Sequence, residues 1–478
     1  MNRALLLAPL QLAQAAVGFC AIALFTRLMS AEAFGRYALA LSLSMLAHTL
    51  LFTWVEAAAF RFLPQLRSET AKSDHFATLL ALAFALGAAT FIAVALALQL
   101  VDFGQEAAAL ASFAAGAAFL RFLVRIARES DRAALDLHRY TIAEAGYLVL
   151  GFGGAVLALV SFDLGAAGPF AGLLLAGLVV AIWDAPRLFA RAKGGRVDSA
   201  RVLFYGGYGA PLALALCIDL AVQAASRLIL ADAAGVDAVG AYAAAFGLAR
   251  TLDVAFMGLS AMLAPMVFNA FETSADAARD AARTMFVSFA ALAAPGAAAL
   301  VLTAPHLAGF MVGTPLSAET ATALPWLAIA GLVGGFNLYY WSEPFQLLSR
   351  TGLRAIVLLA PAGAQVLLTI ALAPFWGAAG AAAAALAGAL LALVVLVATG
   401  SRLFAMPAPL GEIARICGGV MVMTVAMLTA QSAGLFATLA AGAGAYGGGA
   451  LLFNVAGVRA FAWRKAAPFW ARRRAHAH

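Results

Sequence analysis

Long apolar segments separated by short polar ones run along the whole chain. Most are about 20–25 residues long, the length that an α-helix needs to cross the hydrocarbon core of a bilayer. The strict alternation of apolar and polar residues that marks a membrane β-barrel is absent. With helix ends placed at charged residues, the pattern predicts about 14 spans, near residues 4–28, 37–62, 76–101, 107–126, 141–162, 168–187, 203–230, 239–268, 284–303, 320–346, 355–375, 379–400, 413–431 and 435–458. We therefore expect an all-α polytopic membrane protein.

The composition agrees with this interpretation. Of the 478 residues, 64% are hydrophobic and 11% are charged, whereas soluble domains are about 45–50% apolar and about 25% charged. The three cysteines lie inside apolar runs without metal-ligand spacing, and no glycine-rich phosphate loop ending in Lys-Ser or Lys-Thr occurs. The sequence therefore predicts no metal, nucleotide or other cofactor.

The basic residues predict the orientation in the membrane. If the N-terminus is cytoplasmic, all but four of the 30 lysines and arginines fall at the cytoplasmic side, the exceptions being Arg27, Arg36, Arg227 and Arg250. Because basic residues are retained on the cytoplasmic side, this asymmetry places both termini there. The net charge of +7 is then a topology signal and gives no support to nucleic-acid binding. The basic, aromatic tail either lies on anionic lipids of the inner leaflet or is an ordinary cytoplasmic end.

Several short motifs that recur in the same order indicate an internal duplication. Arg27-Leu and Arg227-Leu lie 200 residues apart, and each is followed by a small-acidic pair and then by Gly-x-Tyr-Ala, with Tyr37 and Tyr242 205 residues apart. A Gly-Ala-Ala-Gly motif begins at Gly165 and again 212 residues later. Internal repeats of this kind are common in transporters, where the substrate binds between the repeats. We predict two six-helix bundles, residues 1–200 and 201–400, then two further helices in 401–458 and a basic tail in 459–478.

Polar side chains at membrane depth are the candidate site residues, because burying them in lipid is costly unless they face a cavity. Asp219, Gln223 and Arg227 share one helix face, since they are four residues apart. Arg250 and Asp253 are close enough in sequence to pair. The full candidate set is Arg27, His48, Glu56, Asp219, Gln223, Arg227, Arg250, Asp253 and Asn337.

The residue types suggest two roles. Arginine presents a fixed fork of donors to phosphate oxygens, so a cavity with arginines suits an anionic head group such as a diphosphate. Glu56, Asp219 and Asp253 are candidates for coupling transport to a proton gradient. Plainer interpretations stay open: Arg27 and Arg227 can extend to the interface from their helix ends, and Glu56 can pair with nearby arginines. Similarly, Glu343 can pair with an arginine, and the aromatic cluster 339–341 can belong to the interfacial belt.

The segment from Leu28 to Leu43, LMSAEAFGRYALALSL, resembles the polysaccharide transporter family. The family's first hairpin carries a turn that Glu32, Phe34, Gly35 and Tyr37 fit. The resemblance implies two pseudo-symmetric six-helix bundles and two extra C-terminal helices, in a superfamily that also holds multidrug extruders and the peptidoglycan-precursor flippase. It further implies a non-enzymatic flippase of the bacterial inner membrane that moves undecaprenyl-diphosphate-linked oligosaccharide by alternating access. Membrane lipids, a polysaccharide polymerase and export machinery would then be its partners.

Three alternatives follow from the same sequence. A cation-coupled multidrug exporter of the same superfamily would have an acidic, apolar cavity and usually about 12 helices. A membrane-embedded glycosyltransferase or polymerase would need large outer loops, but the longest predicted outer loop covers only residues 304–319. The third alternative is an assembly scaffold that transports nothing.

Overall fold

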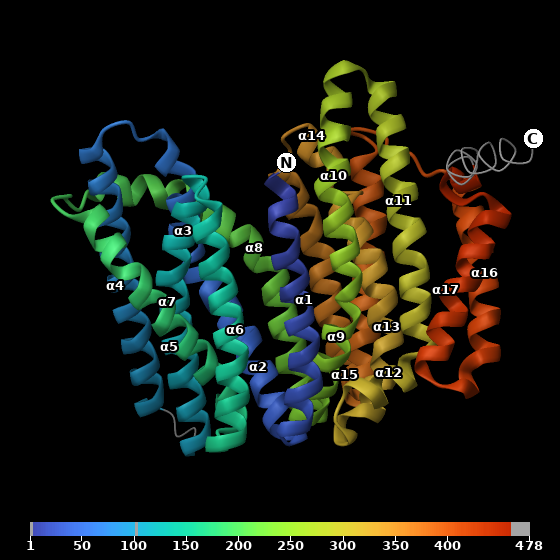
Figure 1. Cartoon of the computed structure of the whole chain (residues 1–478), viewed down its shortest axis with the longest axis horizontal. Helices are drawn as coiled ribbons and strands as arrows, with labels where there is room; N and C mark the ends of the chain where they lie inside the picture. Colours follow the sequence, from blue (N-terminus) through green and yellow to red (C-terminus); the bar gives the residue numbers. More distant parts are fainter. Residues whose placement is uncertain (1–2, 101–103, 460–478) are drawn as a thin grey trace, which may run out of the picture. The chain divides into compact units, whose positions relative to one another are not determined.

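The computed structural model describes residues 3–100 and 104–459, and every regular element in these ranges is a helix (Figure 1). The chain divides into two compact units, Met1–Ala243 and Ala244–His478. The polytopic all-α fold expected from the apolar pattern is confirmed. The predicted basic tail lies outside the described residues except for Arg459.

The first unit contains eight complete α-helices and the start of a ninth. These are α1 (Arg3–Leu28), α2 (Ala31–Leu51), α3 (Thr53–Phe62), α4 (Glu69–Leu100), α5 (Gly104–Ala133), α6 (Leu137–Phe162), α7 (Gly168–Ala192), α8 (Ser199–Ala234) and the first half of α9 (Val236–Ala249). Helix α8 belongs to this unit because it packs along α2 and α3. The repeat boundaries at residues 200 and 400 stay a prediction.

The second unit begins within α9. Its further helices are α10 (Thr251–Thr273), α11 (Ala275–Leu302), α12 (Ala304–Met311), α13 (Thr314–Tyr339), α14 (Glu343–Leu347), α15 (Thr351–Gly400), α16 (Leu410–Ala430) and α17 (Leu435–Phe453). The last two helices form an antiparallel hairpin in which Gly419 and Gly449 bring the backbones together (Figure 1). The Tyr446 hydroxyl donates to the carbonyl oxygen of Ala291 at 2.7 Å and so ties the hairpin to α11.

Among the described residues, 11 helical segments are long and apolar enough to cross a membrane, or 12 if the bent pair α2–α3 is one span. Two features account for the difference from the predicted number. Helix α15 is 50 residues long where the sequence predicts two spans, and the first apolar helix is counted only as the shorter segment Ala13–Leu28. The number of about 14 spans stays a prediction.

The two Gly-Ala-Ala-Gly motifs share one backbone feature at their first glycine. Gly165 and Gly377 both have a positive φ, 47° and 53°, which glycine adopts without steric cost. Gly165 precedes α7, whereas Gly377 interrupts α15 with a ψ of −132°. The Glu319 carboxylate accepts a hydrogen bond from the backbone N–H of Ala378 at 3.1 Å, directly after this break. Glu319 thereby satisfies an amide that the break leaves without a helical acceptor.

The core that positions the candidate site lies where α3, α4, α5 and α8 meet. The rings of Phe52 and Phe122 stack with centroids 4.4 Å apart, and Val55, Leu79 and Ile126 are fully buried around them. Because these apolar residues fix one face of α5 in the core, its polar face is held in place as well.

Candidate functional site

A cavity of about 280 Å³ lies inside the first unit, between helices α2, α3, α5, α6, α7 and α8. Most of its wall is apolar, including Met45, Ala117 and Leu216. Its charged and titratable lining residues are His48, Glu56, Arg121, Arg125 and Tyr147. This cavity therefore concentrates ionisable groups among helices that are long and apolar enough to cross a membrane.

A bend between α2 and α3 brings two of these groups together. The helices meet at Phe52 with an angle of 49°, and His48 and Glu56 lie on either side of the bend. The Nε2 atom of His48 is 2.8 Å from Oε1 of Glu56, and Nε of Arg125 donates to Oε2 of Glu56 at 2.8 Å. The Glu56 side chain is only 3% exposed. Both carboxylate oxygens are thus occupied, as a buried charge requires.

Arginines form a stripe along the second half of α5. Arg121, Arg125, Arg128 and Arg132 are spaced by four, three and four residues, so they share one helix face. Between them, Phe122 and Ile126 point into the core.

Three carboxylates meet this stripe. Besides its bond to Glu56, Arg125 lies 3.7 Å from Glu129, which also pairs with Arg132 at 3.4 Å. Arg128, which is 5% exposed, pairs with Glu144 on α6, and the Gln14 side chain on α1 donates to Glu144 at 2.9 Å. The stripe therefore holds four arginines against three carboxylates, Glu56, Glu129 and Glu144, a surplus of one positive charge.

The surplus falls on Arg121. Within the part of the chain that the structure describes, Arg121 makes no ion pair, and its Nε atom is buried without a hydrogen-bond partner. The Tyr147 hydroxyl and Nδ1 of His48 are also buried without a partner. All three residues line the same cavity. Since buried polar atoms are normally hydrogen-bonded, these groups point to a ligand that is rich in acceptors.

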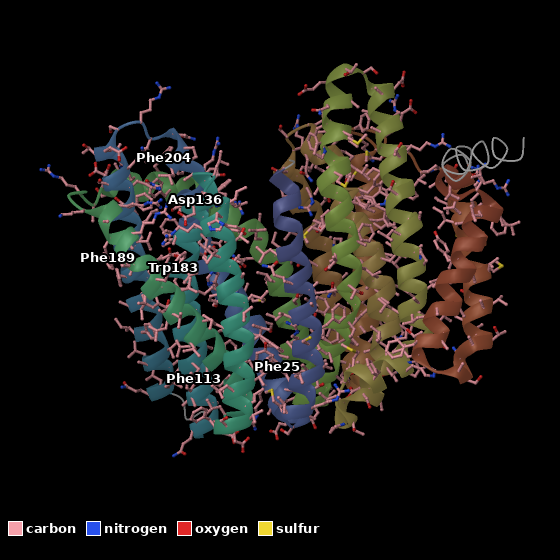
Figure 2. The ribbon with its side chains drawn as sticks, viewed as in Figure 1. Phe25, Phe113, Asp136, Trp183, Phe189 and Phe204 are labelled. Atoms are coloured by element: carbon pink, nitrogen blue, oxygen red, sulfur yellow. The ribbon has the colours of Figure 1, made fainter. Side chains whose placement is uncertain are left out.

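A second ionic network closes one end of the first unit. Asp131, which is 2% exposed, lies 2.9 Å from Arg187 and 3.4 Å from Arg191, while Arg139 contacts Asp184 at 2.8 Å. The Arg139 guanidinium also lies 4.0 Å from the centre of the Trp183 ring. Figure 2 shows Asp136 toward this end of the unit and Phe113 toward the other. Asp136 lies 3.4 Å from Arg187, so three carboxylates face the three arginines, which indicates a structural role.

The structure places the remaining predicted residues of the first unit outside this cavity. Arg27 is exposed and donates to the carbonyl oxygen of Ala23 at 2.7 Å. Gln223 donates to the exposed Asp219 at 2.8 Å, as expected for neighbours on one helix face. Arg227 is buried and interacts electrostatically with the hydroxyl groups of Tyr37 and Tyr242. Both copies of the Gly-x-Tyr-Ala motif therefore meet at one arginine.

In the second unit, Arg250 and Asp253 form an ion pair of 3.3 Å, and their side chains are 62% and 44% exposed. Asn337 is buried and donates to the carbonyl oxygen of Ala389 at 2.8 Å, which ties α13 to α15. Ser342 accepts from Arg354 Nε at 2.8 Å, next to the buried Glu343. The structure therefore gives Asn337 a packing contact, and the substrate role of these residues stays a prediction.

The sequence analysis missed Arg121, Arg125 and Tyr147 as site residues. It ended the fourth span at residue 126, after Arg121 and Arg125, and counted these arginines only as charges that set the orientation. In the structure α5 continues to Ala133, so all four arginines of the stripe lie on one helix. Their spacing of three and four residues was the signal in the sequence that could have identified them.

No protein-family model and no curated protein sequence matches the chain. Solved structures match over most of its length. The lipid II flippase MurJ in an inward closed conformation has a TM-score of 0.76 and 12% identity, covering 94% of this chain and 98% of that one. The protein has the fold that MurJ shares with transporters of the MOP superfamily.

Multidrug transporters of the MATE family support the same conclusion. An inward-facing MATE transporter of the MOP superfamily matches with a TM-score of 0.69 and 17% identity, covering 82% of this chain and 93% of that one. An outward-facing MATE transporter of the same superfamily matches with a TM-score of 0.56 and 16% identity, over 82% and 92% of the two chains. At these identities the likeness concerns the fold, and the substrate must be argued from this chain's own residues.

Proposed function

We propose that the protein is a flippase that moves undecaprenyl-diphosphate-linked oligosaccharides across the bacterial inner membrane by alternating access. Its product would feed the synthesis of a surface polysaccharide such as O-antigen, capsule or exopolysaccharide. The observation that carries the proposal is Arg121, an arginine without an ion pair among the described residues that lines a cavity of about 280 Å³ inside a membrane-embedded unit.

The charge of the cavity favours an anionic substrate. An arginine at membrane depth is costly, and proteins retain such residues where a ligand or a counter-ion compensates them. The three carboxylates along the α5 stripe are occupied by other cations, which leaves Arg121 for a ligand. A diphosphate in a lipid-linked sugar supplies several strong acceptors, and arginine binds such groups with well-defined geometry.

The fold supports the same substrate class. The lipid II flippase MurJ matches this chain over 94% of its length. MurJ is a flippase of lipid II, and the lipid-linked oligosaccharide proposed here is likewise a lipid substrate. Membrane lipids would surround the protein, and a polymerase and export machinery would consume its product.

A cation-coupled multidrug exporter is the second candidate. It is favoured by the buried His48–Glu56 pair, because a carboxylate and an imidazole 2.8 Å apart can take up and release a proton. The similarity to MATE transporters fits this alternative as well. The surplus arginine argues against it, since an organic cation would be repelled from Arg121.

Flipping in proteoliposomes distinguishes the two candidates. Purified protein would be reconstituted with a fluorescent undecaprenyl-diphosphate oligosaccharide, and the label exposed at the outer leaflet would be measured by enzymatic access. We expect protein-dependent movement that protein-free liposomes lack. Movement of organic cations, with none of several lipid-linked glycans, would favour the exporter and overturn the proposal.

A further inference from the structure

Arg125 lines the cavity and is held there by Glu56, a carboxylate that lines the same cavity. The Arg125 side chain is 33% exposed and lines the cavity beside Arg121, one helical turn away on α5. At the same time its Nε atom donates to Glu56 at 2.8 Å. The guanidinium group has five N–H donors, so the bond to Glu56 occupies only part of its capacity.

The polar atoms without partners lie beside this arginine. Arg121 Nε and the Tyr147 hydroxyl are buried and lack hydrogen bonds, and both residues line the cavity with Arg125. The Arg128 guanidinium lies 5.3 Å from the centre of the Tyr147 ring, and Arg128 itself is held by Glu144. Arg128 therefore fixes the Tyr147 ring without competing for the cavity. Two arginines and one hydroxyl remain as donors for a ligand.

The count of charges indicates what the ligand must carry. Arg121 supplies one positive charge that no carboxylate of the described residues balances. A second becomes available only if Arg125 leaves Glu56, whose other oxygen stays 2.8 Å from His48. A diphosphate diester carries about two negative charges, one on each phosphate, and so matches Arg121 and Arg125 together.

We propose that the phosphate groups of the substrate bind between Arg121, Arg125 and Tyr147, and that Glu56 is the internal anion that they displace from Arg125. This rests on the proposed function, which supplies the diphosphate. In the empty protein, Glu56 compensates Arg125 and limits the cost of its burial. When the phosphates arrive, Arg125 exchanges one carboxylate for another anion, and Glu56 remains bonded to His48. Glu56 thereby sets the affinity of the site through its bond to Arg125.

Calorimetric titration of the purified full-length protein with inorganic pyrophosphate tests the anion site. Arg121→Met should weaken binding by at least about tenfold, because a charge-assisted hydrogen bond is lost. Arg132→Met is the matched control, since Arg132 lies on the same stripe but outside the cavity and is 42% exposed. Binding to Arg121→Met as tight as to the wild type, or an equal loss in Arg132→Met, would overturn the site.

A double-mutant cycle tests the role of Glu56. Glu56→Gln should bind pyrophosphate more tightly than the wild type by about tenfold, because Arg125 is no longer held by a carboxylate. In an Arg125→Met background the same substitution should have no effect. If Glu56→Gln does not fold, Glu56→Asp, whose shorter side chain reaches Arg125 less well, should also bind more tightly. Affinity at the wild-type level, or a gain that persists without Arg125, would overturn the displacement.

The flipping assay separates this inference from the proposed function. If Arg121→Met flips lipid-linked oligosaccharide at the wild-type rate, the anion site is wrong while the function stands. If pyrophosphate binds as described but the wild type flips no lipid-linked glycan, the proposed function fails and the anion site stands.

Discussion

Replacing Arg121 by methionine should make the protein more stable and less active at once. Methionine keeps the apolar stem of the side chain but removes the buried Nε donor that has no hydrogen-bond partner. A buried polar group without a partner costs about 1–3 kcal/mol. Because the rest of the guanidinium reaches the cavity, we take the lower part of this range, about 1–2 kcal/mol. For a unit of this size, that corresponds to a rise in Tm of about 2–8 °C.

Arg128→Met is the control with the opposite sign. Arg128 is 5% exposed and pairs with Glu144, so its removal leaves a carboxylate without its cation. Breaking such a pair costs about 3–5 kcal/mol, and Tm should fall. Thermal unfolding in detergent measures both variants, and the proteoliposome assay measures flipping. A fall in Tm for Arg121→Met, or full flipping by that variant, would refute the reasoning that Arg121 destabilises the empty protein and binds the substrate.

Three further substitutions test other parts of the molecule. Glu56→Gln should abolish any response of transport to a pH gradient, because the pair with His48 can no longer exchange a proton; an unchanged response would place coupling elsewhere, with Asp253→Asn as the next variant to assay. Arg250→Ala tests the sequence prediction that Arg250 contacts the substrate: loss of flipping with normal membrane insertion would support that contact, and full activity would remove Arg250 from the site. Gly377→Ala should lower Tm, because alanine at a φ of 53° costs about 1–2 kcal/mol and its Cβ would lie 2.9 Å from Glu319; an unchanged Tm in thermal unfolding would contradict this.

The sequence predicted the helical membrane fold well, since apolar periodicity and length are local properties. It identified His48 and Glu56 separately, because charge at membrane depth is conspicuous. The sequence could not predict that they pair, because the pairing depends on the 49° bend at Phe52. No proline or glycine at that position marks the bend in the sequence. Tertiary packing around Phe52 and Phe122 creates this geometry.

The arginines of α5 were misassigned for a physical reason. A span of about 20 residues is enough to cross the bilayer, so the predicted helix ended at residue 126, after Arg121 and Arg125 but before Arg128 and Arg132. The structure shows that α5 continues for 30 residues, with carboxylates from α3 and α6 compensating two of its arginines. These carboxylates lie on other helices, so no local sequence pattern predicts that they pair with the arginines.

The arginines around Asp131 have two roles, one during membrane insertion and one in the folded protein. In the predicted orientation, Arg139, Arg187 and Arg191 would act singly during insertion, as positive charges that keep the α5–α6 and α7–α8 connections on the cytoplasmic side. After the helices pack, the same guanidinium groups lie within 3.6 Å of Asp131 and hold α5, α6 and α7 together. Helices that inserted the wrong way round could not form this cluster. The ion pairs around Asp131 would thus stabilise only those folded units whose helices were inserted in the correct orientation.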